Sequence, residues 1–347
     1  MVVTENDGRM AALVAWLTTL PEFQCAVDSL LPASSDASFR RYFRVPSGTH
    51  GSLIVMDAPP ALEDSRPFIS VAALLDSADV SVPKIFAADL ADGFLLLSDL
   101  GSKTYLGALL ANDRTDAPGL MNDALAALER MQSRASGSQL PPYDRALLLR
   151  EMNLFIDWYL TRHLGVEPSS AERDMLNSLF ERLVENAQNQ AQVVVHRDYH
   201  SRNLMVLDDA LHHGNPGVLD FQDAVAGPIT YDLVSLLRDA YVEWPEEQAL
   251  DWTVRYWQKA RALGLRVPSD FADFWREFEL MGLQRHLKVL GIFARLSYRD
   301  QKHGYLDDLP LVLRYVRGVA ARYRLAAPLL KLLDRAQGHA TLPRYTF

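Results

Sequence analysis

Three polar side chains stand at a spacing that suits the transfer of a phosphoryl group. In the segment VVVHRDYHSRN, a short apolar run leads into a polar loop that contains Asp198 and, five residues later, Asn203. Asp220 follows a second apolar run, seventeen residues beyond Asn203. Because a hairpin returns its second strand beside its first, Asp220 is expected close to the other two. A carboxylate and an amide oxygen, completed by waters and substrate phosphates, are ligands that Mg²⁺ accepts, and a further carboxylate can take a proton from an attacking hydroxyl.

The elements that must position this loop differ between the two ends of the chain. Near the N-terminus, RMAALVAWLTTL has helical spacing and stops before Pro21, and two β-rich runs, RRYFRV and SLIVMDAP, flank a glycine-containing turn. PFISVAALLDSA predicts a helix, and two more strands meet at the turn Asp92-Gly93. Residues 1–101 are therefore expected to form a small lobe with an antiparallel sheet.

Beyond Gly101 the pattern becomes helical. Apolar residues recur at helical spacing over residues 120–132, 143–163, 171–187, 230–241, 247–263 and 271–299, and in two more segments after Leu309. A β-hairpin with the apolar runs NLMVLD and GVLDF interrupts this helical part. The sequence thus predicts an α+β protein with two lobes, the second of which, residues 102–347, is mainly helical.

The order H-R-D-x-x-x-x-N followed by a metal-binding aspartate is that of the protein-kinase catalytic loop. With HRDYHSRN, LDFQDAVAGPITYDLVSLL and the strand-rich small lobe, the chain resembles the aminoglycoside phosphotransferase and choline kinase-like family over nearly its whole length. The resemblance implies a two-lobed protein-kinase-like fold, with Asp198 as catalytic base and with Asn203 and Asp220 as Mg²⁺ ligands. It also implies that Asp232, in the motif YDL, is a buried acceptor that braces the catalytic loop.

Further motifs narrow the resemblance. The chain contains, in this order, ASFRRYFRV, VMDAPP, FLLLSDLG, HRDYHSRNLM, GVLDFQDAVAGP and QRHLKVLGIFARL. Together they resemble the bacterial anomeric sugar kinases of peptidoglycan recycling, which implies ATP- and Mg²⁺-dependent phosphorylation of N-acetylmuramate and N-acetylglucosamine at O1, giving the α-1-phosphate. Two alternatives stay open: another small-molecule kinase of the same fold, acting on an aminoglycoside, choline or an amino alcohol, and a nucleotide-binding pseudokinase.

The nucleotide side departs from the protein-kinase pattern at two places. LPASSDASFRRYF stands where kinases have a Gly-rich loop but contains no glycine, and Met56 stands where they have the phosphate-binding lysine. Small loop residues can still bring N–H groups and hydroxyls to phosphates, and Arg40, Arg41 or Arg44 of the next strand can supply positive charge. The segment LSDL is the expected hinge for adenine. The nucleotide-binding residues that we expect are Ser35, Ser38, Arg40, Leu97 and Asp99.

The acceptor side is indicated by a run of basic residues in QRHLKVLGIFARLSYRD. Helical spacing forms one basic stripe from Arg285, Lys288, Arg295 and Arg299. Such a stripe suits a sugar that carries a carboxylate and repels a polycationic aminoglycoside. Salt bridges with neighbouring helices are the alternative for each single residue. Arg285 and Lys288, together with Asn153, are the predicted sugar-binding residues.

Other polar residues near the catalytic motif have competing interpretations. His196 and His200 have the spacing of a zinc-binding pair, but they fall in a turn, so His196 is expected to be a packed loop histidine. Arg197 is expected in a structural salt bridge, because the short link after Asp220 leaves no room for an activation loop. Asp223 could approach a second metal ion or cap the turn, and the sequence favours neither.

Composition excludes several classes of protein. The chain has 347 residues and a net charge of −9, so it offers no excess of positive charge to a nucleic acid. Its one cysteine, Cys25, is typical of a reducing compartment, and MVVTENDGRM lacks the basic and apolar regions of a signal peptide. The apolar runs are too short for a bilayer span. We therefore expect a cytoplasmic enzyme with a small-molecule substrate and with neither a nucleic-acid nor a membrane partner.

Overall fold

The computed structural model describes residues 8–34, 39–111, 116–207 and 213–338. The chain forms two compact units: the N-terminal unit comprises Met1–Lys103 and Met205–Asp223, and the helical unit comprises Thr104–Leu204 and Ala224–Phe347. The hairpin segment Met205–Asp223 therefore belongs to the N-terminal unit. The division at residue 101 that the sequence predicts would assign this segment to the second lobe.

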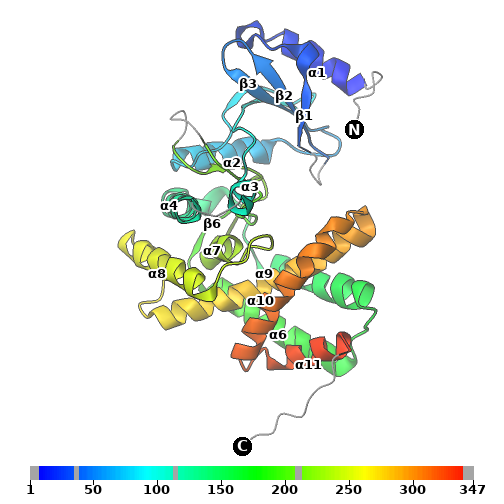
Figure 1. Cartoon of the computed structure of the whole chain (residues 1–347), viewed down its shortest axis with the longest axis vertical. Helices are drawn as coiled ribbons and strands as arrows, with labels where there is room; N and C mark the ends of the chain where they lie inside the picture. The colour runs from blue at the N-terminus through cyan, green and yellow to red at the C-terminus, as the bar shows by residue number, and fades with distance from the viewer. Residues whose placement is uncertain (1–7, 35–38, 112–115, 208–212, 339–347) are drawn as a thin grey trace, which may run out of the picture. The chain divides into compact units, whose positions relative to one another are not determined.

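The N-terminal unit contains a five-stranded antiparallel sheet with the strand order β1-β2-β3-β5-β4 (Figure 1). Its elements are α1 (Gly8–Thr18), η1 (Pro21–Phe23), η2 (Val27–Ser29), β1 (Leu31–Ser34), β2 (Arg41–Ser47), β3 (Gly51–Asp57), α2 (Arg66–Ser77), β4 (Ile85–Asp89) and β5 (Phe94–Ser98). The short strand β8 (Gly217–Val218) also belongs to this unit and pairs with β7 (Leu204–Met205).

Helix α1 covers one face of the sheet. Leu13 and Leu17 of this helix pack into a buried cluster with Phe43, Val45, Leu53, Val55, Phe94 and Leu96. Since side chains alternate along a strand, Tyr42, Arg44 and Met56 lie on the opposite face, which α1 leaves uncovered.

An ion-pair cluster around a buried carboxylate lies at the end of the face that α1 covers. The carboxylate of Asp57, fully buried at the end of β3, accepts hydrogen bonds from Arg9 of α1 and from its cross-strand neighbour Arg41, each at 2.9 Å from the guanidinium Nε. A buried carboxylate needs such partners, because an unpaired charge away from water is costly. Asp57 and Arg41 are thereby explained as structural residues of the N-terminal unit.

The helical unit is built around one long helix. Its elements are α3 (Tyr105–Leu110), α4 (Ala117–Arg134), η3 (Gly137–Gln139), α5 (Arg145–Leu154), the π-helix η4 (Phe155–His163), α6 (Ser170–Asn189), β6 (Gln192–Val195), β9 (Val225–Pro228), α7 (Thr230–Leu237), α8 (Glu246–Ala262), α9 (Phe271–Asp300), η5 (His303–Asp308), α10 (Leu309–Arg322) and α11 (Ala327–Ala336). Helix α9 packs against α5, η4, α6, α7 and α10 (Figure 1), and β6 pairs with β9 in an antiparallel ladder.

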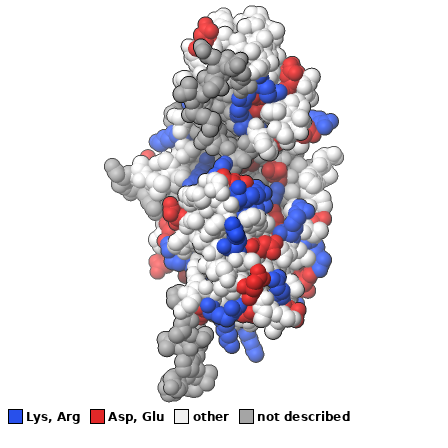
Figure 2. Space-filling model, turned by 90° about the vertical axis from the view of Figure 1, so that its right-hand side faces the viewer, with Lys and Arg blue, Asp and Glu red and all other residues white. Residues whose placement is uncertain are grey.

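Helix α9 carries charged residues that its neighbours bury. Glu279, Arg285 and Lys288 are each at most 5% exposed. A charge buried without a partner is costly, so the charges of these side chains must be balanced by partners on the surrounding elements. By contrast, Figure 2 shows acidic and basic side chains intermingled on the face that it draws.

The predicted α+β, two-lobed fold is confirmed in its elements. The helix expected over residues 143–163 is a single run whose second half, from Phe155, is a π-helix. Helical spacing alone did not indicate this change, nor did it predict β1 or α3. Within the described part of the chain, none of the helices combines the length and hydrophobicity that a bilayer span requires.

Candidate active site

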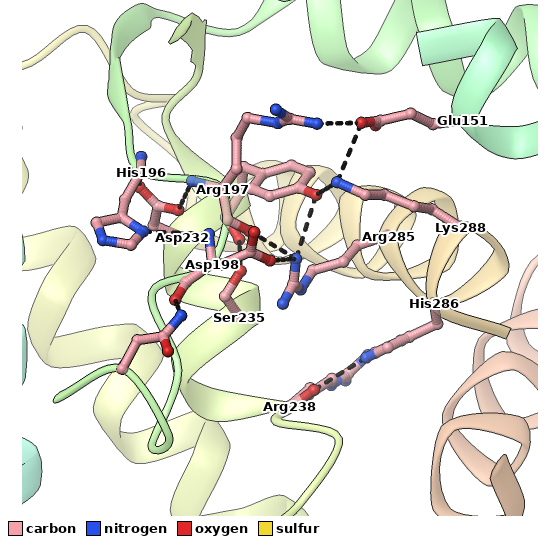
Figure 3. A network of polar contacts seen from close by, with 12 residues as sticks. Glu151, His196, Arg197, Asp198, Asp232, Ser235, Arg238, Arg285, His286 and Lys288 are labelled. Carbon is pink, nitrogen blue, oxygen red and sulfur yellow. Dashed lines mark hydrogen bonds and ion pairs between the residues drawn. The ribbon is translucent and has the colours of Figure 1, made fainter. Parts of the chain in front are cut away.

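The catalytic loop, residues 196–203, follows β6 and is held at its start by Asp232 of α7. The Asp232 carboxylate, fully buried, accepts hydrogen bonds from the backbone N–H groups of His196 at 2.7 Å and of Arg197 at 3.0 Å (Figure 3). Arg197 has a φ of +77°, in the left-handed region that non-glycine residues rarely adopt. Burial raises the pKa of Asp232 to about 7, against the lowering effect of these two N–H groups.

The carboxylate of Asp198 is partly exposed to solvent and has positively charged side chains near it. Its side chain is 42% exposed, and one carboxylate oxygen, Oδ1, lies 3.8 Å from Nη1 of Arg285. Burial tends to raise the pKa of Asp198, but the charges of Lys288 and Arg285 outweigh it and hold the pKa well below the ordinary value. The carboxylate is therefore ionised at neutral pH and accessible enough to accept a proton from a bound hydroxyl.

A buried network fixes the cations beside Asp198. Glu151 of α5 forms ion pairs with Arg197 and with Nζ of Lys288, the latter at 3.1 Å (Figure 3). It also accepts a hydrogen bond from the Tyr143 hydroxyl. Burial opposes the ionisation of Glu151, yet Lys288 and Arg197 lower its pKa. The carboxylate of Glu151 thus serves as the shared counter-ion of two buried cations, and the salt bridge expected for Arg197 is with Glu151.

The phenol of Tyr231 joins Arg285 to Lys288. Its oxygen accepts hydrogen bonds from Nη1 of Arg285 at 3.2 Å and from Nζ of Lys288 at 3.0 Å. Arg285 also donates to the main-chain oxygen of Arg197 at 2.8 Å. Arg285 and Lys288, the two predicted sugar-binding cations of α9, therefore bind the catalytic loop and the residues that support it. Neither is more than 5% exposed.

The third predicted sugar-binding residue lies apart from this network. Asn153 is exposed on α5, and its amide nitrogen donates to the carbonyl of Leu149 within the same helix at 2.8 Å. The structure thus places Arg285 beside the catalytic loop and Asn153 at the surface of the helical unit. The sugar contacts of Asn153, Arg285 and Lys288 remain predictions.

Asn203 ends the catalytic loop. Its amide nitrogen donates to the main-chain oxygen of Asp198 at 3.0 Å, which turns the amide oxygen the other way. His196, 1% exposed, accepts the N–H of Asp198 on its ring nitrogen and is the packed loop histidine that the sequence predicts. Within the described ranges, no group of three or more His, Cys, Asp or Glu side chains is placed to hold a metal ion.

Asp220 belongs to the N-terminal unit, two residues after β8. The β8 strand is fixed there by the N–H of Val218, which donates to the carbonyl of Ser81 at 2.7 Å. Asp220 has a φ of +62°, and Gln222 donates to its Oδ1 at 2.7 Å. The amide oxygen of Asn203 and the carboxylate of Asp220 are hard oxygen donors, so their chemistry fits Mg²⁺.

The predicted nucleotide-binding residues of the N-terminal unit have different environments. Ser35 and Ser38 lie outside the described residues. Arg40 pairs with Glu63 at 3.0 Å, and Leu97 is buried in β5. Asp99 accepts hydrogen bonds from Arg44 at 2.6 Å and from Ser52 at 2.7 Å, so its carboxylate braces the strands.

Sequence reasoning missed several residues that support the loop. Tyr143 and Tyr231 are part of the network around Glu151, and Asp239 accepts the N–H of the loop residue Ser201 at 3.1 Å. Tyr231 could have been found, because it precedes Asp232 in the motif YDL. Tyr143 is remote in sequence from any motif, and Asp239 lies just past the end of LDFQDAVAGPITYDLVSLL, so neither carried such a signal.

A separate cavity of about 700 Å³ lies among α7, α8, α9 and α10 in the helical unit. Its charged lining is internally paired: Arg238 with Glu279, Arg314 with Glu243, and Arg322 with both Glu246 and Glu279. These paired charges offer no uncompensated group to a ligand, so the catalytic loop remains the candidate site.

Comparison with known proteins agrees with this site. The model of the phosphotransferase enzyme family matches residues 29–265, and the chain belongs to that family. It is 49% identical to the N-acetylmuramate/N-acetylglucosamine kinase of Pseudomonas aeruginosa over 336 residues, which cover 94% of this chain and 97% of the relative. The kinase of that name from Pseudomonas putida is 45% identical over 344 residues, 97% and 99% of the two chains.

A solved structure shows the fold independently. The ADP-bound structure of an aminoglycoside phosphotransferase matches with a TM-score of 0.58 at 14% sequence identity, covering 89% of this chain and 98% of that one. The predicted membership of the aminoglycoside phosphotransferase-like family and the predicted protein-kinase-like fold are confirmed. The chain is a phosphotransferase by family.

Proposed function

We propose that this chain is an ATP-dependent anomeric kinase that phosphorylates N-acetylmuramate and N-acetylglucosamine at O1, in the recycling of cell-wall sugars in the cytoplasm. The observation that carries the proposal is the braced, ionised and 42% exposed carboxylate of Asp198 in a chain so similar to kinases of these two sugars. The α-configuration of the product follows from the resemblance alone.

Asp198 is the proposed catalytic base. It orients the O1 hydroxyl and accepts its proton while the O1 oxygen forms a bond to the γ-phosphorus. The bond between that phosphorus and the bridging oxygen breaks, and the electron pair leaves with ADP. An anomeric hydroxyl is more acidic than an ordinary alcohol, because the ring oxygen withdraws electrons. A carboxylate whose pKa lies below its ordinary value is therefore a sufficient base for this acceptor.

Asn203 and Asp220 are the residues that would hold Mg²⁺. When bound, the ion neutralises charge on the transferred phosphoryl group. Asn203 is tied to the main chain of Asp198 by its amide nitrogen, so the proposed ligand and the proposed base share one rigid loop. This arrangement favours positioning and electrostatics as the main sources of rate enhancement.

Arg40 is the proposed replacement for the missing phosphate-binding lysine. It immediately precedes β2 and pairs with Glu63, three residues before α2, much as the kinase lysine pairs with a glutamate of the following helix. Continuing the alternation of β2 by one residue would put Arg40 on the face of Tyr42 and Met56, which α1 leaves uncovered. Ser35, Ser38, Leu97 and Asp99 remain the other proposed nucleotide contacts.

A cationic acceptor fits this site less well. A cationic acceptor at Asp198 would compete with Lys288 and Arg285, whose charges already stabilise the ionised carboxylate. Met56 is the one feature that favours a pseudokinase. The presence of Asp198, Asn203 and Asp220 argues for turnover.

The proposed function is tested by a coupled assay of ADP release with purified protein and Mg²⁺. The acceptors are N-acetylmuramate, N-acetylglucosamine, choline and a 4,6-disubstituted aminoglycoside, and ³¹P NMR of the product identifies the phosphorylated position. We expect turnover with both amino sugars, an anomeric phosphate signal, and loss of turnover with EDTA. Turnover with choline or the aminoglycoside alone would refute the acceptor, and binding of ATP without any turnover would favour the pseudokinase.

A further inference from the structure

The four cations of the basic stripe on α9 have different environments in the folded chain. Arg285 and Lys288 are buried and bound to the supports of the catalytic loop. Arg299, exposed at the next-to-last position of the helix, makes two hydrogen bonds with its neighbour Asp300, at 2.8 and 2.9 Å. None of these three cations has its charge uncompensated.

Arg295 is the exception. Its side chain is partly buried, and it has neither a hydrogen bond nor an ion pair with any residue that the structure describes. Its Nε atom is withdrawn from solvent without an acceptor. Burial and the nearby Arg299 lower the pKa of Arg295, while Glu151 acts in the opposite direction. A guanidinium in this situation gains from an anion that reaches it, since a desolvated donor without a partner is costly.

The position of Arg295 relative to the catalytic support is fixed by helix packing. Arg295 follows Lys288 by seven residues, which places it two turns further along the same face of α9, about 10 Å away. Between them, a Cβ on Gly291 would lie 2.3 Å from the carbonyl carbon of Leu154. The helix therefore packs directly against the backbone where α5 becomes the π-helix η4.

The same junction connects Arg295 with the counter-ion of the catalytic support. Glu151 lies three residues before Leu154 on α5, binds Lys288, and is within electrostatic range of Arg295. Helix α9 packs along η4, and π-helical segments are frequent at functional sites. Arg295 thus lies on the same helix face as Lys288 and is coupled electrostatically to Glu151, the counter-ion of the catalytic support.

We propose that Arg295 binds the carboxylate of the acidic amino-sugar acceptor and thereby determines how well that acceptor is used; this rests on the proposed function. The two proposed acceptors differ chemically at one place, because N-acetylmuramate carries a lactyl ether with a carboxylate and N-acetylglucosamine carries a free hydroxyl there. A guanidinium can bind a carboxylate through two parallel hydrogen bonds. Only N-acetylmuramate can make this contact, which stabilises its bound state throughout the reaction.

The variant Arg295→Gln tests the assignment. A charge-assisted hydrogen bond is worth about one to two powers of ten in affinity, so KM for N-acetylmuramate should rise about 10- to 100-fold with kcat little changed. The kcat/KM for N-acetylglucosamine should stay within about twofold, and this turnover also shows that the variant is folded. The conservative variant Arg295→Lys should recover part of the loss with N-acetylmuramate.

Arg299→Gln is the matched control, because it removes a cation one turn further on the same helix whose charge Asp300 already balances. It should leave both sugars unaffected. A calorimetric titration with N-acetylmuramate, without nucleotide, should show the same loss of affinity for Arg295→Gln. An unchanged KM for N-acetylmuramate, or an equal loss of kcat/KM with both sugars, would overturn the role assigned to Arg295 but not the proposed function. Absence of turnover with both sugars in the unmodified protein would instead overturn the proposed function, and the titration would still decide the role of Arg295.

Discussion

Replacing Glu151 by glutamine should destabilise the helical unit strongly. The side chains of Glu151 and Lys288 are 7% and 4% exposed, so their charges interact away from water. Arg197, 19% exposed, shares the same carboxylate. Removal of one partner from a buried ion pair costs about 3–5 kcal/mol, because the remaining charge stays buried without compensation. For a unit of roughly 200 residues, each kcal/mol shifts Tm by about 2–4 °C, so Glu151→Gln should lower Tm by about 6–20 °C.

Differential scanning calorimetry at several pH values provides the assay. The pKa of Glu151 is lowered in the folded protein from an ordinary value of 4.5. Its contribution to the free energy of unfolding is therefore fully present above pH 4.5 and is lost as the pH falls through the lower folded value. The difference in Tm between the unmodified protein and Glu151→Gln should be constant from pH 6 to 8 and should shrink below pH 4.5.

Two further variants make this reasoning refutable. Glu181→Gln removes a carboxylate of an exposed pair with Arg145, whose side chain is 59% exposed, and should shift Tm by less than about 3 °C. Adding Lys288→Met to Glu151→Gln removes one of the two stranded cations and should recover part of the lost stability. A Glu151→Gln protein that melts within about 2 °C of the unmodified one, or a double variant that is less stable than the single one, would refute a shared counter-ion.

Three other predictions concern the catalytic loop. Asp198→Asn should lower kcat by about 10²- to 10⁴-fold in the coupled assay, and should lower Tm less than Glu151→Gln does, because the Asp198 side chain is 42% exposed. Since the pKa of Asp198 lies below its ordinary value of 3.8, kcat/KM should not fall between pH 8 and pH 5 from protonation of the base. Asp232→Ala leaves the loop N–H groups of His196 and Arg197 without their acceptor, at about 1–3 kcal/mol each, and should lower both Tm and kcat.

Each of these expectations has a contrary result. Turnover of Asp198→Asn within a few-fold of the unmodified protein would exclude Asp198 as the base. The direction given for the pKa of Asp198 would be contradicted if kcat/KM fell with a midpoint above pH 5 and this fall disappeared in Arg285→Gln. A stable and fully active Asp232→Ala protein would show that the loop keeps its conformation without the carboxylate.

The helices and the catalytic motif were predictable because their signals are local. Apolar residues repeat along the chain at the period of the helix, and α6 adds a capping box in which Ser169 and Glu172 satisfy each other's backbone groups. The loop that carries Asp198 and Asn203 was recognised by a motif of eight residues, HRDYHSRN. Each of these features depends on residues that are neighbours in sequence.

The pairing of charges was not predictable, because it depends on contacts between distant helices. The basic stripe on α9 was identified from spacing, and spacing carries no information on depth of burial or on the partner of each cation. Lys288 binds Glu151, which lies on α5 and whose other partners come from the loop after η3 and from the catalytic loop. The change from α-helix to π-helix at Phe155 likewise coincides with a contact between distant segments, the close approach of α9 at Gly291 to Leu154.

The burial of cations behind Asp198 imposes a condition on the acceptor. Lys288 and Arg285 stabilise the ionised carboxylate, so they make Asp198 a weaker base than an ordinary aspartate. The weaker the base, the more the reaction depends on a hydroxyl that gives up its proton readily. An anomeric hydroxyl meets this condition better than the primary or secondary hydroxyls of choline or an aminoglycoside. The same cations that disfavour a positively charged acceptor thus also favour a sugar that reacts through its anomeric centre, so charge and acidity select the same class of substrate.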